Sequence, residues 1–161
     1  MRHLLNSSLL AVPLPAFASD RAVITQTIQG IATSVDARDW SRLDLKFGDD
    51  GILNQLSLET DEGTRVNKKT VAETWAELLP RFYRTKLEIS EIEILGLSTI
   101  MARATARYHA SDRVGVHVWE QTGLLDYVLK NTTEGCQVTA LNTRPERESR
   151  PLFDLLASRI N

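Results

Sequence analysis

The first half of the chain carries apolar residues at helical spacing. Ile24, Ile28, Ile31 and Val35 follow one another at intervals of four, three and four residues, which places them on one face of a helix. The pattern predicts a helix that starts at Asp20 and turns this apolar face toward a core.

Two more helices and a short hairpin are predicted before residue 83. Asp39 can cap a second helix, in which Trp40 and Phe47 share an apolar face. A turn is expected at residues 48–51, then a strand over residues 52–58 with a hairpin partner at residues 64–66. Thr70 and Glu73 have the spacing of a capping box, which predicts a third helix from this point that buries Trp75.

The second half alternates apolar and polar residues, which is the period of a β-strand. The expected strands are residues 87–94, 99–110, 114–130 and 136–144. The expected turns are residues 96–98, 111–113 and 131–135. The phase slips at Ser90 and Glu91, which indicates a bulge, Gly123 is expected to bend its strand, and Pro145 is expected to end the last one. Helices followed by a meander of long strands predict an α+β fold, with a helical layer on one curved antiparallel sheet.

Composition and charge narrow the function classes. A chain of 161 residues is large enough for one domain with its own core. Its net charge of −2, with charges scattered along the chain, gives no basic surplus, so we expect no nucleic-acid partner.

The N-terminal residues differ from the rest of the chain. Arg2 precedes a broken apolar stretch over residues 4–14 and then Ala16-Phe17-Ala18, the pattern of a secretory signal peptide and its cleavage site. We therefore expect a signal peptide over residues 1–18, a domain over residues 19–145 and a tail with a short helix over residues 146–161. The protein would then be secreted or periplasmic. The apolar stretch is too short to cross a membrane, and the alternative is a loosely packed arm.

The single cysteine excludes an internal disulfide. Cys136 lies in a strand pattern with no histidine near it in sequence, which favours a buried apolar cysteine over a catalytic thiol. His109 and His117 lie near one hairpin, but no further ligand completes a set, so no metal site is expected.

The succession of elements resembles the nuclear transport factor 2-like superfamily, and within it the SnoaL-like and ketosteroid-isomerase-like proteins. The likeness rests on residues 35–40, 47–50 and 66–75, and on Glu134-Gly135 after the long strands. It implies three N-terminal helices packed on the concave side of a sheet that curls into a cone. The cone of such proteins holds a small organic molecule, and members include isomerases, dehydratases, cyclases, epoxide hydrolases and binding proteins without activity.

The catalytic residues of a ketosteroid isomerase are missing. Aligned on the family, Gln55 stands where the carboxylate base would be, Ile31 near the tyrosine position and Leu125 near the position of the protonated aspartate. The resemblance therefore does not imply ketosteroid isomerase activity, nor is the Arg-x-Asp arrangement of the epoxide hydrolases of this family present.

A different polar set is expected to serve the pocket. The catalytic candidates are His109, Tyr127 and Asn142, since a histidine near neutral pH can act as a general acid or base. The candidate ligand-binding residues are Trp75, Trp119, Gln121, Leu125, Arg107 and His117. The alternatives remain open that the histidines are exposed on the strands and that Arg107 only forms a cross-strand pair.

These observations lead to three hypotheses. The first is an exported enzyme that isomerises, dehydrates or cyclises an apolar or partly polar organic molecule by proton transfer, without a cofactor. The second is a carrier that binds such a molecule without chemistry. The third is an interaction module that dimerises through the outer face of its sheet, and a homodimer is expected from the family.

Overall fold

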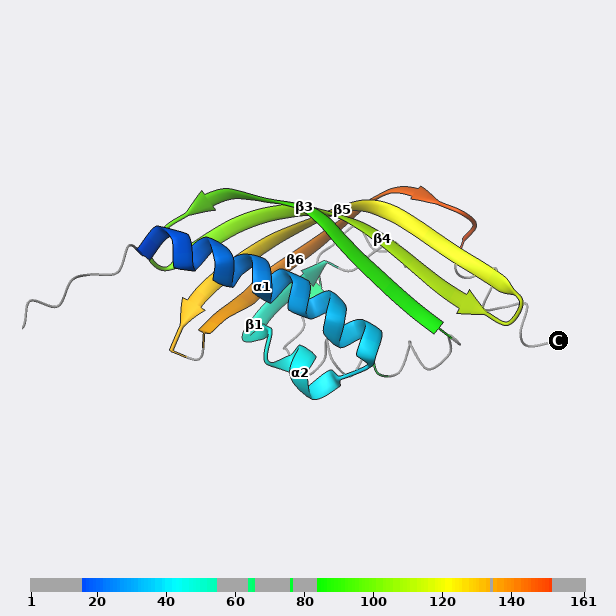
Figure 1. Cartoon of the computed structure of the whole chain (residues 1–161), viewed down its shortest axis with the longest axis horizontal. Helices are drawn as coiled ribbons and strands as arrows, with labels where there is room; N and C mark the ends of the chain where they lie inside the picture. Colours follow the sequence, from blue (N-terminus) through cyan, green and yellow to red (C-terminus); the bar gives the residue numbers. More distant parts are fainter. Residues whose placement is uncertain (1–15, 55–63, 66–75, 77–83, 134, 152–161) are drawn as a thin grey trace, which may run out of the picture.

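The computed structural model describes residues 16–54, 64–65, 76, 84–133 and 135–151. Two helices and six strands lie in this part of the chain. They are α1 (Ala16–Ala37), α2 (Trp40–Asp44), β1 (Phe47–Asn54), β2 (Thr64–Arg65), β3 (Arg84–Leu97), β4 (Met101–Val114), β5 (His117–Thr132) and β6 (Gly135–Glu148). The α+β class is therefore as expected, and α1 crosses the concave face of a curved sheet (Figure 1).

The six strands form one sheet in the order β2-β1-β6-β5-β4-β3. Strands β3 to β6 are a long antiparallel meander, and β1 and β2 form the expected antiparallel hairpin. Strand β1, however, pairs in parallel with β6. The sheet is thus mixed, whereas the sequence predicted an antiparallel one, because pairing between strands about 90 residues apart leaves no local signal.

The core lies between α1 and the concave face of the sheet. The predicted stripe of α1 is confirmed, because Ile24, Ile28, Ile31 and Val35 are at most 5% exposed. Across β4 and β5, small side chains face large ones. The facing pairs are Ala102 and Leu129, Ala104 and Tyr127, and Ala106 and Leu125. The alanines leave room for the larger neighbours, and all six residues belong to the same core cluster as the apolar stripe of α1.

The end of α1 is closed by its own backbone. Arg38 adopts a left-handed conformation with φ of 55°, and its N–H donates to the carbonyl of Val35 at 3.0 Å. The N–H of Asp39 donates to the carbonyl of Ser34 at 2.9 Å, which completes a Schellman motif. The Asp39 carboxylate then accepts from the N–H of Arg42 at 3.0 Å, which confirms its predicted role as the cap of α2.

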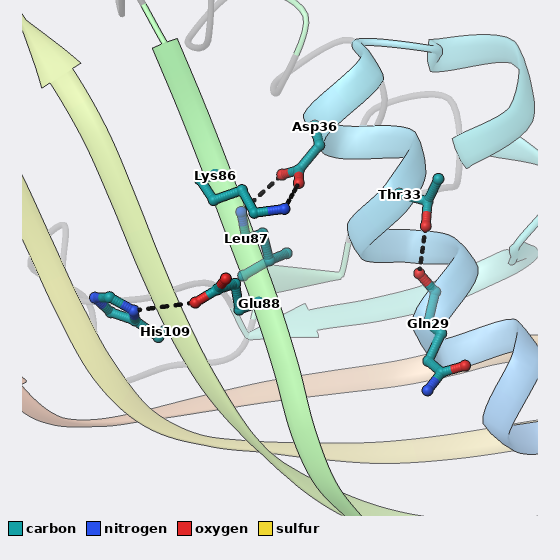
Figure 2. A network of polar contacts seen from close by, with 7 residues as sticks. All are labelled: Gln29, Thr33, Asp36, Lys86, Leu87, Glu88 and His109. Carbon is teal, nitrogen blue, oxygen red and sulfur yellow. Dashed lines mark hydrogen bonds and ion pairs between the residues drawn. The ribbon is translucent and has the colours of Figure 1, made fainter.

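The same end of the helix is tied to the edge strand. Asp36 accepts from the backbone N–H of Leu87 at 2.7 Å and from the ammonium of Lys86 at 3.0 Å (Figure 2). One carboxylate thus fixes the angle at which α1 meets β3.

Several boundaries differ from those expected. Helix α1 begins at Ala16 rather than Asp20, since Ala16-Phe17-Ala18 contains strong helix formers. Phe47 belongs to β1 instead of α2, and the predicted turn at residues 48–51 is strand. The third predicted helix, except for the helical Ala76, and the predicted C-terminal helix lie outside the described residues, so two of the three expected helices are described.

The predicted turn at residues 111–113 is wrong, because these residues belong to a strand. Strand β4 continues to Val114, which pairs with His117, so the turn consists of Gly115 and Val116. Gly115 has φ of 63°, and a two-residue hairpin needs such a residue because positive φ matches the strand twist. Asp112 is therefore a strand residue.

The irregular positions of the sheet match the sequence in part. The bulge at Ser90 and Glu91 is confirmed, since the pairing shifts after Ser90 and Glu91 has φ of 48°. The pairing of β5 with β6 shifts at Gly123, where a bend was expected. Pro145 does not end β6. It lies opposite Gly123 at this shift, where a missing N–H is tolerated. The four long strands extend beyond their predicted C-terminal ends, so the turn after β3 lies at residues 98–100 instead of 96–98 and the turn after β5 is shorter than expected.

Candidate functional site

Polar side chains gather at one end of the concave face, where β4 and β5 approach their shared hairpin. Pairing places Asp112 directly opposite Trp119, Ala110 opposite Gln121, and Tyr108 opposite Gly123. All these side chains share the face that packs toward α1, because the burial alternates along both strands. We call Asp112, Trp119, Gln121 and Tyr108 the polar end of the concave face.

Tyr108 and Gln121 form a buried pair. The Tyr108 hydroxyl donates to Gln121 Oε1 at 2.8 Å, and the residues are 5% and 2% exposed. Since the residue opposite Tyr108 is glycine, no side chain blocks the phenol from reaching along β5. With Oε1 engaged, the amide nitrogen is the group of Gln121 that donates to a further acceptor. Burial, then the charges of Glu148 and Glu146, raises the pKa of Tyr108, so it keeps its proton at neutral pH.

Asp112 is a carboxylate almost removed from water. It is 7% exposed, and its Oδ1 has no hydrogen-bond partner among the described residues. Burial raises its pKa to about 6, and the negative charge of Asp36 acts in the same direction. Thr85 and Arg38 oppose the shift, although the Thr85 hydroxyl, one strand away, makes no well-formed hydrogen bond to the described residues. A buried acceptor without a partner is uncommon in proteins and indicates a ligand or water at this point.

Trp119 closes the hairpin end of this face. Its indole N–H donates to Glu148 Oε1 on β6 at 2.8 Å, and the residue is 6% exposed. The bond holds the ring beside Asp112, so Trp119 forms a fixed apolar wall next to the carboxylate.

Tyr127 lies in a different part of the concave face. It is 1% exposed, its hydroxyl has no partner among the described residues, and burial raises its pKa. It pairs with Ala104, eight residues before Asp112 on β4, a separation of roughly 27 Å along a strand. Tyr127 therefore cannot act together with Asp112 on one small molecule.

The expected site residues fall on both faces of the sheet. Trp119, Gln121, Leu125 and Tyr127 share the concave face. Trp75 lies outside the described residues. The others are on the outer face or at the hairpin, and these are Arg107, His109, Asn142 and the exposed His117. The three catalytic candidates are not brought together, because neighbouring strand residues point to opposite faces.

On the outer face, His109 lies between two carboxylates. Its Nδ1 points toward the Glu88 carboxylate (Figure 2) at a distance of 3.5 Å, and its Nε2 is 3.3 Å from Glu120. Arg107 contacts Glu91 at 3.2 Å and Glu146 at 3.1 Å. Arg107 thus has the cross-strand partners of its alternative, and His109 is a partly exposed strand residue, as its own alternative stated.

Asn142 takes part in a second polar cluster of the outer face. It pairs with Asp126, which accepts from Arg144 at 2.6 and 2.9 Å and from the Thr105 hydroxyl at 3.1 Å. The Arg144 guanidinium, with smaller effects of Thr105 and Asn142, lowers the pKa of Asp126. This cluster fastens β4, β5 and β6 together.

The remaining chemistry-bearing groups offer less. Cys136 is half-buried at the start of β6, and burial raises the pKa of its thiol, which disfavours the reactive thiolate. In the described ranges, no three histidine, cysteine or acidic side chains are arranged to hold a metal ion. None of the helices in the same part of the chain has the length and apolar character needed to span a bilayer.

The sequence interpretation missed Asp112 and Tyr108. Both follow from the alternation that runs through Ala102, Ala104 and Ala106, since its next members are Tyr108, Ala110 and Asp112. The signal was obscured because Ser111-Asp112-Arg113 has a turn-like composition, whereas the turn is formed by Gly115.

Comparison with known proteins gives matches by structure alone. No protein-family model matches the sequence, and no curated protein is similar to it. The Kfla4162 protein from Kribbella flavida superposes with a TM-score of 0.79, at 15% identity over 88% of this chain and 99% of that one. The hexachlorocyclohexane dehydrochlorinase LinA type 2 gives a TM-score of 0.71, at 14% identity over 83% and 89% of the two chains.

A third similar structure belongs to the NTF2-like family. It is a protein from Streptomyces avermitilis, with a TM-score of 0.71 and 8% identity over 81% of this chain and 99% of that one. At such identities the comparison establishes the fold and leaves the activity open. The chain therefore has the fold of the nuclear transport factor 2-like superfamily, as the resemblance of its sequence predicted.

Proposed function

We propose that this protein is an enzyme that converts a small organic molecule at the polar end of the concave face by proton transfer, without a cofactor. The observation that supports this most is Asp112, a buried carboxylate with a pKa of about 6, whose Oδ1 accepts no hydrogen bond from the residues that the structure describes. A general base works best when its pKa lies near the working pH. A carboxylate whose pKa is raised by burial in this way is typical of active sites.

The neighbouring residues suit the same reaction. Asp112 removes a proton from a carbon next to a carbonyl, and the electron pair of the C–H bond moves to the carbonyl oxygen. The amide N–H of Gln121 donates to this oxygen as charge develops, held in orientation by Tyr108. Trp119 packs against the apolar part of the molecule and excludes water.

The proton on Asp112 then has three possible destinations. Its return to another carbon of the substrate completes an isomerisation. Its transfer to a departing hydroxyl group releases water, forms a carbon–carbon double bond and regenerates the carboxylate, which is a dehydration. Attack of the enolate carbon on a second group of the same molecule gives a cyclisation, with the proton passing to that group.

The similar structures favour elimination within this set. They include a hexachlorocyclohexane dehydrochlorinase and a proposed scytalone dehydratase from Novosphingobium aromaticivorans. A dehydrochlorinase removes hydrogen chloride and a dehydratase removes water, so both names denote elimination reactions. Because the identities are below 20%, these names support the class of reaction and leave the substrate open. The proposal includes the cone-shaped pocket of the family, with Trp75 of the predicted third helix as a wall.

The test uses proton exchange, which needs no knowledge of the natural product. The full chain is incubated with a panel of small hydroxy-ketones and unsaturated ketones in deuterated water, and deuterium incorporation and water loss are followed by mass spectrometry. We expect Asp112→Asn to lose exchange at least about a hundredfold. The matched control is His109→Gln, which alters the outer face and leaves the concave face unchanged.

The outcomes separate the hypotheses. Loss in Asp112→Asn with activity retained in His109→Gln supports the proposal, and the opposite pattern refutes it. If native mass spectrometry shows a retained molecule and neither exchange nor elimination occurs with it, the protein is the carrier of the second hypothesis.

Export and dimerisation are further parts of this proposal. A mature chain that begins at Ser19 would lack the first three residues of α1, and N-terminal sequencing of the protein from its host tests this. We expect a homodimer, and the same native mass spectrum gives the subunit count.

A further inference from the structure

A pair of arginines lies on the outer face at the same end of the sheet as Asp112, with the sheet between them and the proposed catalytic site. Arg84 on β3 is directly opposite Arg113 on β4, and Arg113 is directly opposite Val118 on β5. These three residues form one row across the sheet. Like charges directly opposite each other on neighbouring strands destabilise a sheet, so the pair calls for an explanation.

Neither guanidinium has a carboxylate partner in the described part of the chain, although other acids lie near. Glu120 belongs to the next row and contacts His109 at 3.3 Å, while Asp36 contacts Lys86 at 3.0 Å. The hydrogen bond from Lys86 to Asp36 raises the pKa of Lys86, and the positive charge of Arg84 opposes this effect. Three cationic groups thus lie together. Of these, Lys86 is paired with Asp36, a residue of α1.

The row forms part of a groove. A space of about 360 Å³ is lined by Arg84, Lys86, Ser111, Arg113 and Val118. Pockets of this size hold small organic ligands. Val118, which is 47% exposed, supplies an apolar wall beside the charges, and the Ser111 hydroxyl supplies a neutral donor.

We propose that this groove binds a phosphate monoester with a small apolar group. A guanidinium presents a planar fork of N–H donors that matches phosphate oxygens, and two forks side by side can hold two edges of one phosphate. The dianion relieves the repulsion between Arg84 and Arg113, which explains why the like-charge pair is tolerated. Its apolar substituent lies against Val118. Because the groove is on the outer face, this inference stands or falls separately from the proposed reaction.

The test measures phosphate binding to the full chain. Inorganic phosphate and phenyl phosphate are titrated separately, with amide chemical shifts of β3, β4 and β5 as the readout, at two salt concentrations. We expect phenyl phosphate to bind more tightly than phosphate, and higher salt to weaken both. Arg113→Gln is expected to weaken binding at least about tenfold, since it removes charge-assisted hydrogen bonds.

The control is Arg103→Gln, because Arg103 is an exposed arginine on the same face of the same strand, paired with Gly96 and Val128. Equal weakening in both variants would show a general effect of charge and refute the site, as would an absence of shifts in the wild-type protein. Arg84→Gln is a second variant in case Arg113→Gln does not fold.

A second arm identifies the source of the phosphate group. Vesicles of phosphatidylcholine with and without phosphatidic acid are sedimented with the protein. Sedimentation that depends on phosphatidic acid and on Arg113 supports the site and makes a lipid headgroup the ligand. Phosphate shifts without sedimentation support the site and make a soluble monoester the ligand.

Discussion

The Tyr108 hydroxyl lies 2.8 Å from Gln121 Oε1, and this hydrogen bond joins β4 to β5 inside the polar end of the concave face. Both residues are at most 5% exposed, so water does not compete for the bond. The bond fixes the orientation of the Gln121 amide, because Oε1 faces the Tyr108 hydroxyl and the amide nitrogen is left to donate elsewhere. The orientation of the proposed oxyanion donor therefore depends on one phenol.

Tyr108→Phe is expected to destabilise the protein by about 1–2 kcal/mol, because Gln121 Oε1 loses its donor in a buried place. The matched control is Tyr127→Phe. Its hydroxyl has no partner among the described residues, so its removal is expected to be neutral or slightly stabilising. Urea unfolding of both variants gives the comparison, and an equal loss in the two would show that Tyr127 has a partner.

Asp112→Asn is expected to raise stability at pH 7. Its pKa is about 6 in the folded protein against an ordinary 3.8, so between these values the folded state binds more protons than the unfolded state. Stability therefore falls as the pH rises through this window, by up to about 3 kcal/mol, and stays lower above it. The variant should lose this dependence. Unfolding free energies from pH 4 to pH 8 check it, and a wild-type stability that increases across the window would contradict it.

The proposed reaction should show the same titration. The base form of Asp112 dominates above pH 6. The specificity constant kcat/KM is therefore expected to fall tenfold per pH unit below about pH 6. Asp36→Asn removes a nearby negative charge that raises this pKa, and should move the profile toward lower pH. A profile that does not move would remove Asp112 from the role of base.

Asp36→Ala is expected to cost about 1–2 kcal/mol, because the half-buried N–H of Leu87 loses its acceptor. Lys86→Gln removes only the ion pair with the same carboxylate, and since Lys86 is exposed it should leave the midpoint of urea unfolding nearly unchanged. Comparable losses in the two variants would show that the ion pair, rather than the backbone hydrogen bond, anchors α1 to β3.

Gly123→Ala is expected to destabilise the protein by about 2 kcal/mol or more. A Cβ at this position would collide with the carbonyl oxygen of Arg144 and lie 2.9 Å from the Cα of Pro145, and backbone atoms cannot move aside. Gly96→Ala is the control, since nothing lies within 4 Å of its Cβ position, and it should be neutral to within about 0.5 kcal/mol. Thermal unfolding distinguishes the two, and a tolerated Gly123→Ala would mean that β5 and β6 are paired differently.

Local patterns were enough to predict the elements that bury one face. The stripe from Ile24 to Val35, the cap at Asp39 and the bulge at Glu91 could all be read from the sequence. Each depends on residues within a few positions of one another, so spacing alone carries the information. The same is true of the shared face of Trp119, Gln121 and Tyr127.

The site itself depended on contacts that spacing does not contain. Ser111-Asp112-Arg113 is acceptable both as a turn and as a strand, and the positive φ of Gly115 places the turn after it, which makes Asp112 a buried strand residue. Alternation puts His109 on the outer face, but its carboxylate partners Glu88 and Glu120 come from the two neighbouring strands. The parallel pairing of β1 with β6 joins residues far apart in the chain. Burial of a charge is decided by what packs over it from elsewhere in the fold, so the pKa of Asp112 and the role we assign to it follow from the tertiary structure.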